Sequence, residues 1–124
     1  MYGNLAGYLK TLYFSTSNDD IVLINPNIIL DGDGINFYYK MIDSHNAKLS
    51  TSSKDNQIIC DVINNYDKYK DYIDKINSRF NTTIDFDNLT LSIEFRRNEI
   101  TLTDAIMRLT QAVYIYFNIS LLTK

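Results

Sequence analysis

The chain has 124 residues, of which 45% are hydrophobic, so it is long enough for one domain with a substantial core. Its formal net charge of −3 disfavours a general nucleic-acid binder, because such proteins carry an excess of Lys and Arg. A single cysteine, Cys60, excludes an intramolecular disulfide and suits a reducing compartment. We therefore expect one domain over residues 1–124, located in the cytoplasm of a bacterial host cell.

Neither a signal peptide nor a membrane span is predicted. Residues 1–14 have no basic leader before their apolar residues and no small-residue cleavage site. Charged residues such as Lys10 and Arg108 interrupt the apolar stretches before any reaches membrane-spanning length. We expect no membrane partner. The wealth of Asn, Ile, Lys, Tyr and Asp is typical of proteins from AT-rich genomes of low-GC bacteria and their phages.

The first 30 residues predict a short helix followed by β-structure. Leu5, Leu9 and Leu12 recur at helical spacing, so we expect an amphipathic helix over residues 2–14 and a polar break over 15–20. Residues 21–30, IVLINPNIIL, are rich in β-branched residues around Pro26. Because proline cannot donate to a β-ladder, this run fits either two short strands or one edge strand with a bulge.

A hairpin is predicted next. The tetrapeptide 31–34, Asp-Gly-Asp-Gly, lies between two β-rich runs. A calcium loop is the alternative for Asp31 and Asp33, but no third oxygen ligand and no distal Glu follow at the required spacing. Residues 35–42, INFYYKMI, predict a half-buried strand, and after a turn residues 47–51, AKLST, can return as a third strand.

Residues 54–80 predict helical structure with apolar residues at steps of three and four. The pattern fits one long helix or two helices joined near Tyr69 to Asp71. The runs 82–86, TTIDF, and 88–95, NLTLSIEF, then predict a second hairpin through Asp87-Asn88. We expect the following residues to face inward: Ile84, Phe86, Leu89, Leu91, Ile93 and Phe95.

The helix on which we expect the other elements to pack covers residues 101–124. Thr101 can cap its N-terminus, with Asp104 three positions later. One arc of the helix is apolar and contains Leu102, Ala105, Ile106, Leu109, Ala112, Val113, Tyr116 and Phe117. The alternative for the β-branched and aromatic run 113–117 is a strand. These patterns predict an α+β fold: an antiparallel sheet of two hairpins packed against a long central helix, or two, and a C-terminal helix, with a short N-terminal helix.

The residues predict no catalytic, cofactor-binding or metal-binding site. The only histidine, His45, lies in a predicted turn, and Cys60 lies among apolar helical residues without a nearby base. One Cys and one His cannot build a usual zinc site, and the four glycines fit no phosphate loop. The enzymatic alternative is a metal-dependent nuclease that uses a carboxylate cluster drawn from Asp31, Asp33, Asp85, Asp87 and Glu94.

Two surfaces are predicted to bind partners. Asp19, Asp20, Asp31 and Asp33 lie on two loops with no basic residue between Lys10 and Lys40, so we expect one strongly acidic end of the molecule. Such an end should speed encounter with a basic partner, such as the nucleic-acid groove of a defence enzyme; the alternative is that the acids solvate turns and deter edge pairing. The second surface lies outside the apolar arc of the last helix and predicts a homodimer, with cover by the N-terminal helix as the alternative: Tyr114, Ile115, Leu121 and Leu122.

Five runs follow one another in a recognisable order: IVLINP, INFYYKMI, AKLSTSSKDNQIICDVI, IDKINSRFNTTIDFDNLTLSIEF and ITLTDAIMRLTQAVYIYF. In this order the stretch from about residue 21 to 117 resembles the prokaryotic and phage family known as domain of unknown function eighteen-twenty-eight. That family usually carries Leu-Thr-Asp and then Gly where this chain has Leu-Ser-Thr-Ser at 49–52. The resemblance implies occurrence in low-GC bacteria and mobile elements, and it implies no activity.

We therefore expect a small non-enzymatic protein-binding module, an accessory protein of a phage or mobile element that inhibits a host defence or regulatory protein. Ten tyrosines support this, because tyrosine is favoured at interfaces. The alternatives are the metal-dependent nuclease and a structural homo-oligomer.

Overall fold

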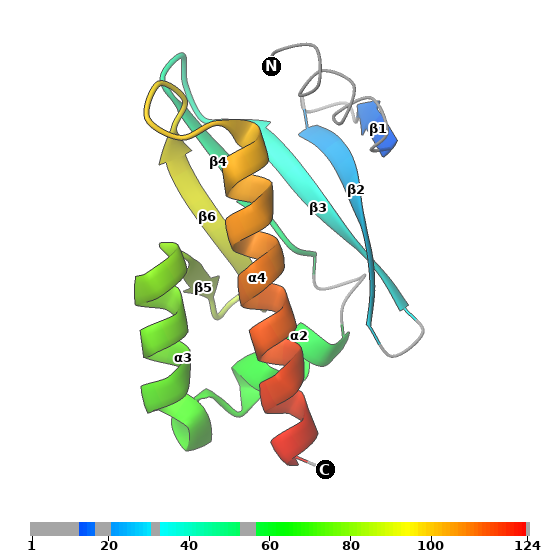
Figure 1. Cartoon of the computed structure of the whole chain (residues 1–124), viewed down its shortest axis with the longest axis vertical. Coiled ribbons are helices and arrows are strands. Elements are labelled where there is room, and N and C mark those ends of the chain that lie inside the picture. The colour runs from blue at the N-terminus through cyan, green and yellow to red at the C-terminus, as the bar shows by residue number, and fades with distance from the viewer. Residues whose placement is uncertain (1–12, 17–20, 31–32, 53–56, 124) are drawn as a thin grey trace.

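The computed structural model describes residues 13–16, 21–30, 33–52 and 57–123. Within these residues the fold is α+β, as predicted: a six-stranded antiparallel sheet in the order β1-β2-β3-β4-β6-β5, with three α-helices against it (Figure 1). The elements, in chain order, are β1 Tyr13–Thr16, β2 Ile21–Leu30, β3 Asp33–Met41, β4 Asn46–Ser50, α2 Gln57–Asn64, α3 Tyr66–Phe80, β5 Thr83–Asp85, β6 Thr90–Arg96, α4 Leu102–Ser120 and the 3-10 turn η1 Leu121–Thr123.

The predicted N-terminal helix over 2–14 lies outside the described residues except for its last two. Tyr13 and Phe14 belong to β1 instead, where they pair with Asn25 and Ile24 of β2. The helical prediction is therefore wrong at these two positions. Aromatic residues suit a strand that has a partner beside it, and the spacing of three leucines gave no information about that partner.

β2 is one strand with an irregularity at Pro26 rather than two short strands. Its register with β3 shifts between Ile24 and Ile28, and its pairing with β1 ends at Asn25. Pro26 is thus paired with no residue of β1 or β3, as expected for a residue without an N–H. The predicted edge position is wrong for the first half of the strand, because β1 pairs there.

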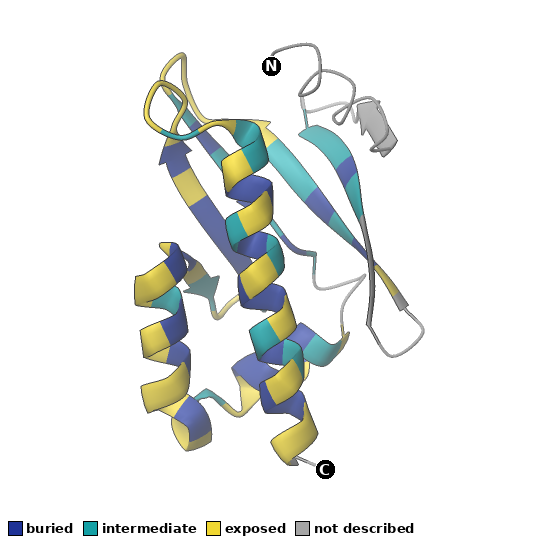
Figure 2. Ribbon diagram, in the orientation of Figure 1, coloured by how far each residue is buried: buried dark blue, intermediate teal, exposed yellow. Residues whose placement is uncertain are grey.

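α4 forms over most of the predicted range of 101–124: the α-helix ends at Ser120, and η1 continues the chain to Thr123. Its N-terminus is capped as expected, since the Asp104 N–H donates to Thr101 Oγ1 at 3.1 Å. The run 113–117 is helical, so the strand alternative is wrong. One side of α4 is buried against the sheet and α2 (Figure 2). The largest fully buried side chains of the sheet and α4 are Ile24, Ile35, Phe37, Leu49, Leu91, Ile93, Ile106, Leu109 and Tyr116.

The central helical segment consists of two helices that separate at Asn65, earlier than the predicted junction. The Asn65 side chain donates to the Asp61 C=O at 2.7 Å, which competes with continued helical bonding. A kink follows at Tyr69, within the predicted junction, where the φ of −116° is not helical. α3 ends at Phe80, and the C-cap Asn81 has a left-handed φ of 59° and donates its N–H to the Asn77 C=O. This turn redirects the chain from α3 into β5.

The second hairpin is confirmed, with Asp85 paired to Thr90 across a four-residue turn. Leu91, Ile93 and Phe95 are buried as predicted. Phe86 is not, because it lies in the turn after β5 ends, where strand alternation no longer applies. Phe86 is 54% exposed, and its ring meets the Tyr66 ring edge-on at 5.1 Å between centroids.

Candidate functional site

One face of the sheet has no described helix over it, and we call it the open face. Successive strand residues point to opposite sides. Because Ile24, Leu49 and Ile93 are buried on the helix side, their chain neighbours point the other way. Two cross-strand rows follow from the register: Leu23, Tyr38, Ser50, Ser92 and Thr83 in one, and Ile21, Lys40, Lys48 and Glu94 in the other.

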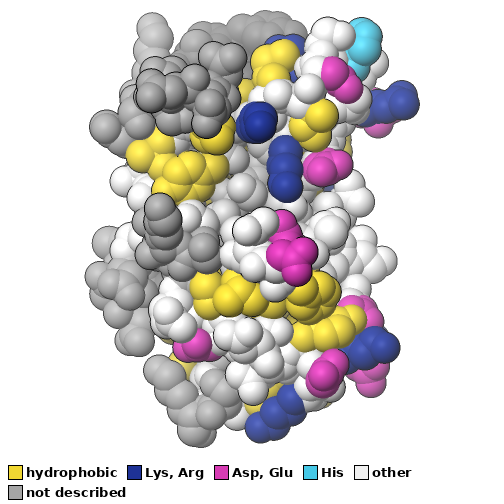
Figure 3. All heavy atoms as spheres, turned by 180° about the vertical axis from the view of Figure 1, so that it is seen from behind, with side chains coloured by type: hydrophobic (Ala, Val, Ile, Leu, Met, Phe, Trp, Pro, Cys, Tyr) yellow, Lys and Arg dark blue, Asp and Glu magenta, His cyan; other side chains and the backbone are white. Residues whose placement is uncertain are grey.

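The open face is mixed in character. Figure 3 shows hydrophobic, basic and acidic side chains interspersed on this side of the molecule. Lys40 and Lys48 lie directly opposite one another, an arrangement that costs free energy unless another charge offsets it. Glu94 lies opposite Lys48 on the other side and offsets part of this repulsion. Leu23 and Tyr38 are partly buried and opposite each other.

The second feature of this region is an incomplete sheet edge. β5 pairs only with residues 90–92 of β6, and β6 continues to Arg96 with no described strand on that side (Figure 1). Toward β4, the Thr51 N–H donates to the Leu91 C=O at 2.9 Å and the Arg97 N–H donates to the His45 C=O at 2.8 Å.

These two bonds fix which main-chain groups face outward. In an antiparallel pair, alternate residues direct both N–H and C=O to the same neighbour. Since residues 91 and 97 bond toward β4, the main-chain groups of Glu94 and Arg96 face the open edge. The Arg96 C=O accepts from the N–H groups of Glu99 and Ile100, both at 3.0 Å. The Glu94 N–H, the Glu94 C=O and the Arg96 N–H are the remaining groups on this edge.

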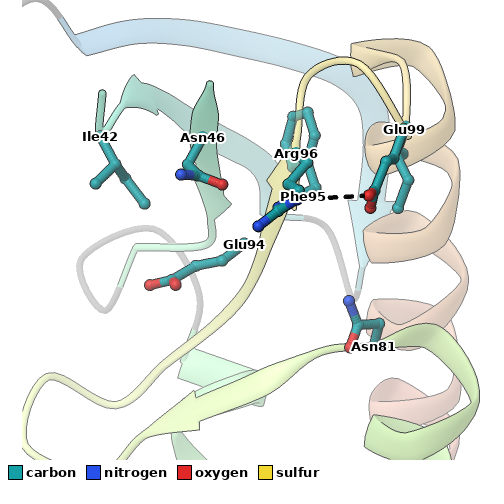
Figure 4. A pocket seen from close by; sticks show the side chains of 8 residues that line it. Ile42, Asn46, Asn81, Glu94, Phe95, Arg96 and Glu99 are labelled. Atoms are coloured by element: carbon teal, nitrogen blue, oxygen red, sulfur yellow. Dashed lines mark ion pairs between the residues drawn. The ribbon is translucent and has the colours of Figure 1, made fainter. Parts of the chain in front are cut away.

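A hollow of about 480 Å³, which we call the edge hollow, lies beside these groups. In Figure 4, Ile42 and Asn46 lie on one side of Arg96, and Glu99 on the other. Arg96 and Glu99 form an ion pair at 3.9 Å, with both side chains about two-thirds exposed, so the pair contributes little to stability. The full lining is Ile42, Asn46, Asn81, Glu94, Phe95, Arg96, Glu99 and Ile100.

A second, smaller hollow of about 290 Å³ shares Asn81 and Glu94 with the edge hollow. Its other lining residues include Lys48 and Ser92 of the open face. Glu94 therefore belongs to both, and the two hollows join the open face to the β6 edge. Sequence reasoning did not single out Glu94 and Arg96 as a pair. A signal was present, since the predicted runs of five and eight residues leave one hairpin strand longer than its partner.

Of the aspartates proposed for a metal cluster, Asp85 has a structural role. The Asp85 carboxylate accepts from the N–H groups of Asp87 and Asn88, at 3.0 and 3.1 Å, and from the Asn88 side chain at 2.8 Å. The bond from the Asn88 side chain is the largest cause that lowers the Asp85 pKa. Asp31 lies outside the described residues, and Asp33 begins β3. Among the described residues, no three His, Cys, Asp or Glu side chains lie close enough to hold a metal ion.

His45 and Cys60 occupy the positions that the sequence indicated. His45 is exposed in the β3–β4 turn, where its N–H donates to the Asp43 carboxylate at 2.8 Å. Cys60 is buried on α2, and its Sγ donates to the Leu89 C=O at 3.7 Å. Burial raises the pKa of the Cys60 thiol, which disfavours the thiolate needed for nucleophilic chemistry.

The predicted acidic end falls almost entirely on residues that the structure does not describe. Asp19, Asp20 and Asp31 lie outside the described residues, and Asp33 begins β3, where it pairs with Leu30. Partner binding through these four aspartates therefore stays a prediction.

The apolar residues predicted outside the α4 arc are largely accessible. Tyr114, Leu121 and Leu122 are 44%, 49% and 63% exposed, while Ile115 packs partly against the core. The end of the helix is anchored through Leu122, whose C=O accepts from the Tyr69 hydroxyl at 3.1 Å.

No family model, curated protein or solved structure matches this chain. Its resemblance to the domain of unknown function therefore stays a prediction. Within the described residues, no helix combines the length and apolar character needed to cross a membrane.

Proposed function

We propose that this chain is a small non-enzymatic protein-binding module that contacts its partner through the open face and the adjoining β6 edge. The observation that carries the proposal is the contrast between the two sides of one sheet. Helices bury one side, and the other presents partly buried Leu23 and Tyr38 beside Lys40, Lys48 and Glu94. Such a mixture of aromatic, aliphatic and charged groups is typical of non-obligate interfaces.

The proposed partner is a nucleic-acid-binding host defence or regulatory protein in the cytoplasm, which the chain inhibits on behalf of a phage or mobile element. The excess of fifteen acids over twelve basic residues favours a partner with a basic surface. The resemblance noted above supports the mobile-element origin. Direct nucleic-acid binding is disfavoured, because Glu94 lies beside the two lysines of the open face.

The proposal of a non-enzymatic role has one structural support. A nuclease would need carboxylates that are free to bind a metal ion. Asp85, a described member of that cluster, instead accepts three hydrogen bonds within its own turn. Self-association through Tyr114, Leu121 and Leu122 stays a separate prediction, which light scattering would test.

Site-specific photo-crosslinking tests the proposed surface. A photoreactive amino acid replaces Lys40 on the open face in one variant and Lys70 on the exposed side of α3 in another. Both are expressed in the source organism, and the crosslinked proteins are identified by mass spectrometry. We expect one protein to be captured from position 40 and not from position 70, and the purified pair to form a complex of defined stoichiometry.

Two results would contradict the proposal. One is equal capture of the same protein from both positions. The other is cleavage of DNA or RNA by the purified chain that depends on magnesium or manganese and is lost in Asp85→Ala.

A further inference from the structure

We infer that the β6 edge at Glu94 to Arg96 is a strand-addition site for an extended segment of the protein partner. This inference rests on the proposed function and names the element of the partner that the site would bind. The occupant is a short antiparallel segment with an acidic residue, an apolar residue and a basic residue in that order.

The main chain supplies the first part of the argument. The Glu94 N–H, the Glu94 C=O and the Arg96 N–H face the same edge, as the bonding of residues 91 and 97 toward β4 requires. An added antiparallel strand would pair with all three. The ladder would end at Arg96, because Glu99 and Ile100 donate to the Arg96 C=O. The site is therefore about three residues long.

Among the described residues, no strand pairs with this part of β6 on the side away from β4. Thr83 pairs with Ser92, so a straight continuation of β5 would place residue 81 opposite Glu94. Asn81 instead has a left-handed φ of 59° as the C-cap of α3, so the chain before Thr83 does not continue along β6. The edge hollow of about 480 Å³ is lined at this position by Asn81, Glu94 and Ile100, and it extends past Arg96 to Ile42 and Asn46.

Side-chain chemistry selects the order of residues in the segment. Glu94 and Arg96 are exposed and point to the open face, whereas Phe95 points to the helix side, where Ile100 also lines the hollow. An antiparallel segment would place its first residue opposite Arg96, its second opposite Phe95 and its third opposite Glu94. Opposite charges directly across a strand pair are favourable, so an acidic, an apolar and a basic residue fit in turn.

A second copy of the chain offers the same charges, because antiparallel β6 strands would set Glu94 against Arg96 of the other copy. That register would also bring the turn after Arg96 of each copy against Asn81 of the other, where α3 ends. A peptide segment carries no such turn. The hollow therefore fits a segment of a partner better than a second β6.

The test uses ¹⁵N-labelled full-length protein and a synthetic peptide with a central Glu-Val-Lys flanked by threonines. We expect the amide signals of Glu94 and Arg96 to shift on titration with peptide. The matched control peptides carry one N-methyl group. Methylation of the Lys nitrogen, which would face β6, should weaken binding at least tenfold, whereas methylation of the Val nitrogen, which would face away, should change it less than twofold.

A double variant, E94R with R96E, tests the side chains of the protein with an unmethylated peptide. It should bind the Glu-Val-Lys peptide at least tenfold more weakly and prefer a peptide with the two charges exchanged. Three results would overturn the inference. The first is that the amide signals do not shift at millimolar peptide, and the second is that both N-methyl groups weaken peptide binding equally. The third is that the signals shift without peptide while the mass of the protein in solution doubles, which would assign the edge to a second copy. If a partner is captured from position 40 but the amide signals of Glu94 and Arg96 do not shift with peptide, the inference is overturned and the proposed function stays intact.

Discussion

The two faces of the sheet are built from the same strands and differ in how far their side chains are buried. On the helix side, Leu49 and Ile93 are directly opposite one another and fully buried. One residue along, Lys48 and Glu94 are also opposite one another, yet Lys48 is partly buried and Glu94 is exposed. Burial of apolar surface is the main source of folding stability, so substitutions on the two faces should separate stability from binding.

The largest effect is expected from a pair of alanine substitutions in β6. Ile93→Ala should lower the free energy of unfolding by about 2–5 kcal/mol, because it leaves a cavity in the core. Glu94→Ala, one residue away on the open face, should change it by less than about 0.5 kcal/mol. Urea unfolding measures both. A comparable loss for Glu94→Ala would show that the open face is part of the stabilising core.

Proline substitutions compare a paired position with an edge position. Lys48 belongs to a central strand, and the alternation along β4 directs its N–H to β3, so Lys48→Pro breaks a ladder bond. We expect a loss of about 2–3 kcal/mol, since an acceptor on β3 is left unpaired. Glu94→Pro removes an N–H that faces the open edge and should cost roughly half as much or less. Equal losses in urea unfolding would mean that the β6 edge is already paired.

Tyr116 tests the covered side by pH. Its hydroxyl is buried and donates to Asn77 Oδ1 at 2.9 Å. Burial, the largest cause, raises its pKa well above the ordinary value of 10. The folded state thus holds this proton more tightly than the unfolded state, and the resulting stability is present below pH 10 and lost as the pH rises above it.

Tyr116→Phe should cost about 1 kcal/mol at pH 7 and should weaken the fall in stability above pH 10. Tyr72→Phe is the control, because Tyr72 is 64% exposed on α3. Thermal unfolding from pH 7 to 11 measures both. An identical alkaline fall in Tyr116→Phe and in the unmodified chain would show that Tyr116 does not contribute.

The smallest effect is expected at Asp85. Its lowered pKa means that its contribution is present above the unfolded pKa and lost as the pH falls through the folded one. Asp85→Ala should lower the unfolding midpoint slightly at pH 7 and not at pH 2. Magnesium should not change the midpoint of the unmodified chain. A rise of several degrees with magnesium that Asp85→Ala abolishes would instead support a metal site.

Local patterns predicted the parts of the fold that local chemistry decides. The Thr101 cap, the apolar arc of α4 and the burial of Leu91, Ile93 and Phe95 all follow from spacing and residue type. Phe86 was misplaced because the end of β5 depends on how far β6 pairs with it.

Features that depend on strand partners were less predictable. Tyr13 and Phe14 are extended because β2 lies beside them. The candidate site has the same origin. Glu94 and Arg96 form a candidate site because no described strand pairs with them on the side away from β4. The sequence indicates this unpaired edge only indirectly, because the two predicted strands of the hairpin differ in length.

The central claim is that the open face binds the partner and the helix side of the molecule does not. The most direct measurement is the affinity of the partner captured from position 40 for two tyrosine variants, by titration calorimetry. Tyr38→Ala removes an aromatic group from the open face, and Tyr72→Ala removes one from α3. We predict at least a tenfold loss for Tyr38→Ala and less than a twofold change for Tyr72→Ala, with both variants folded. Unchanged affinity in Tyr38→Ala, or a loss confined to Tyr72→Ala, would contradict the account.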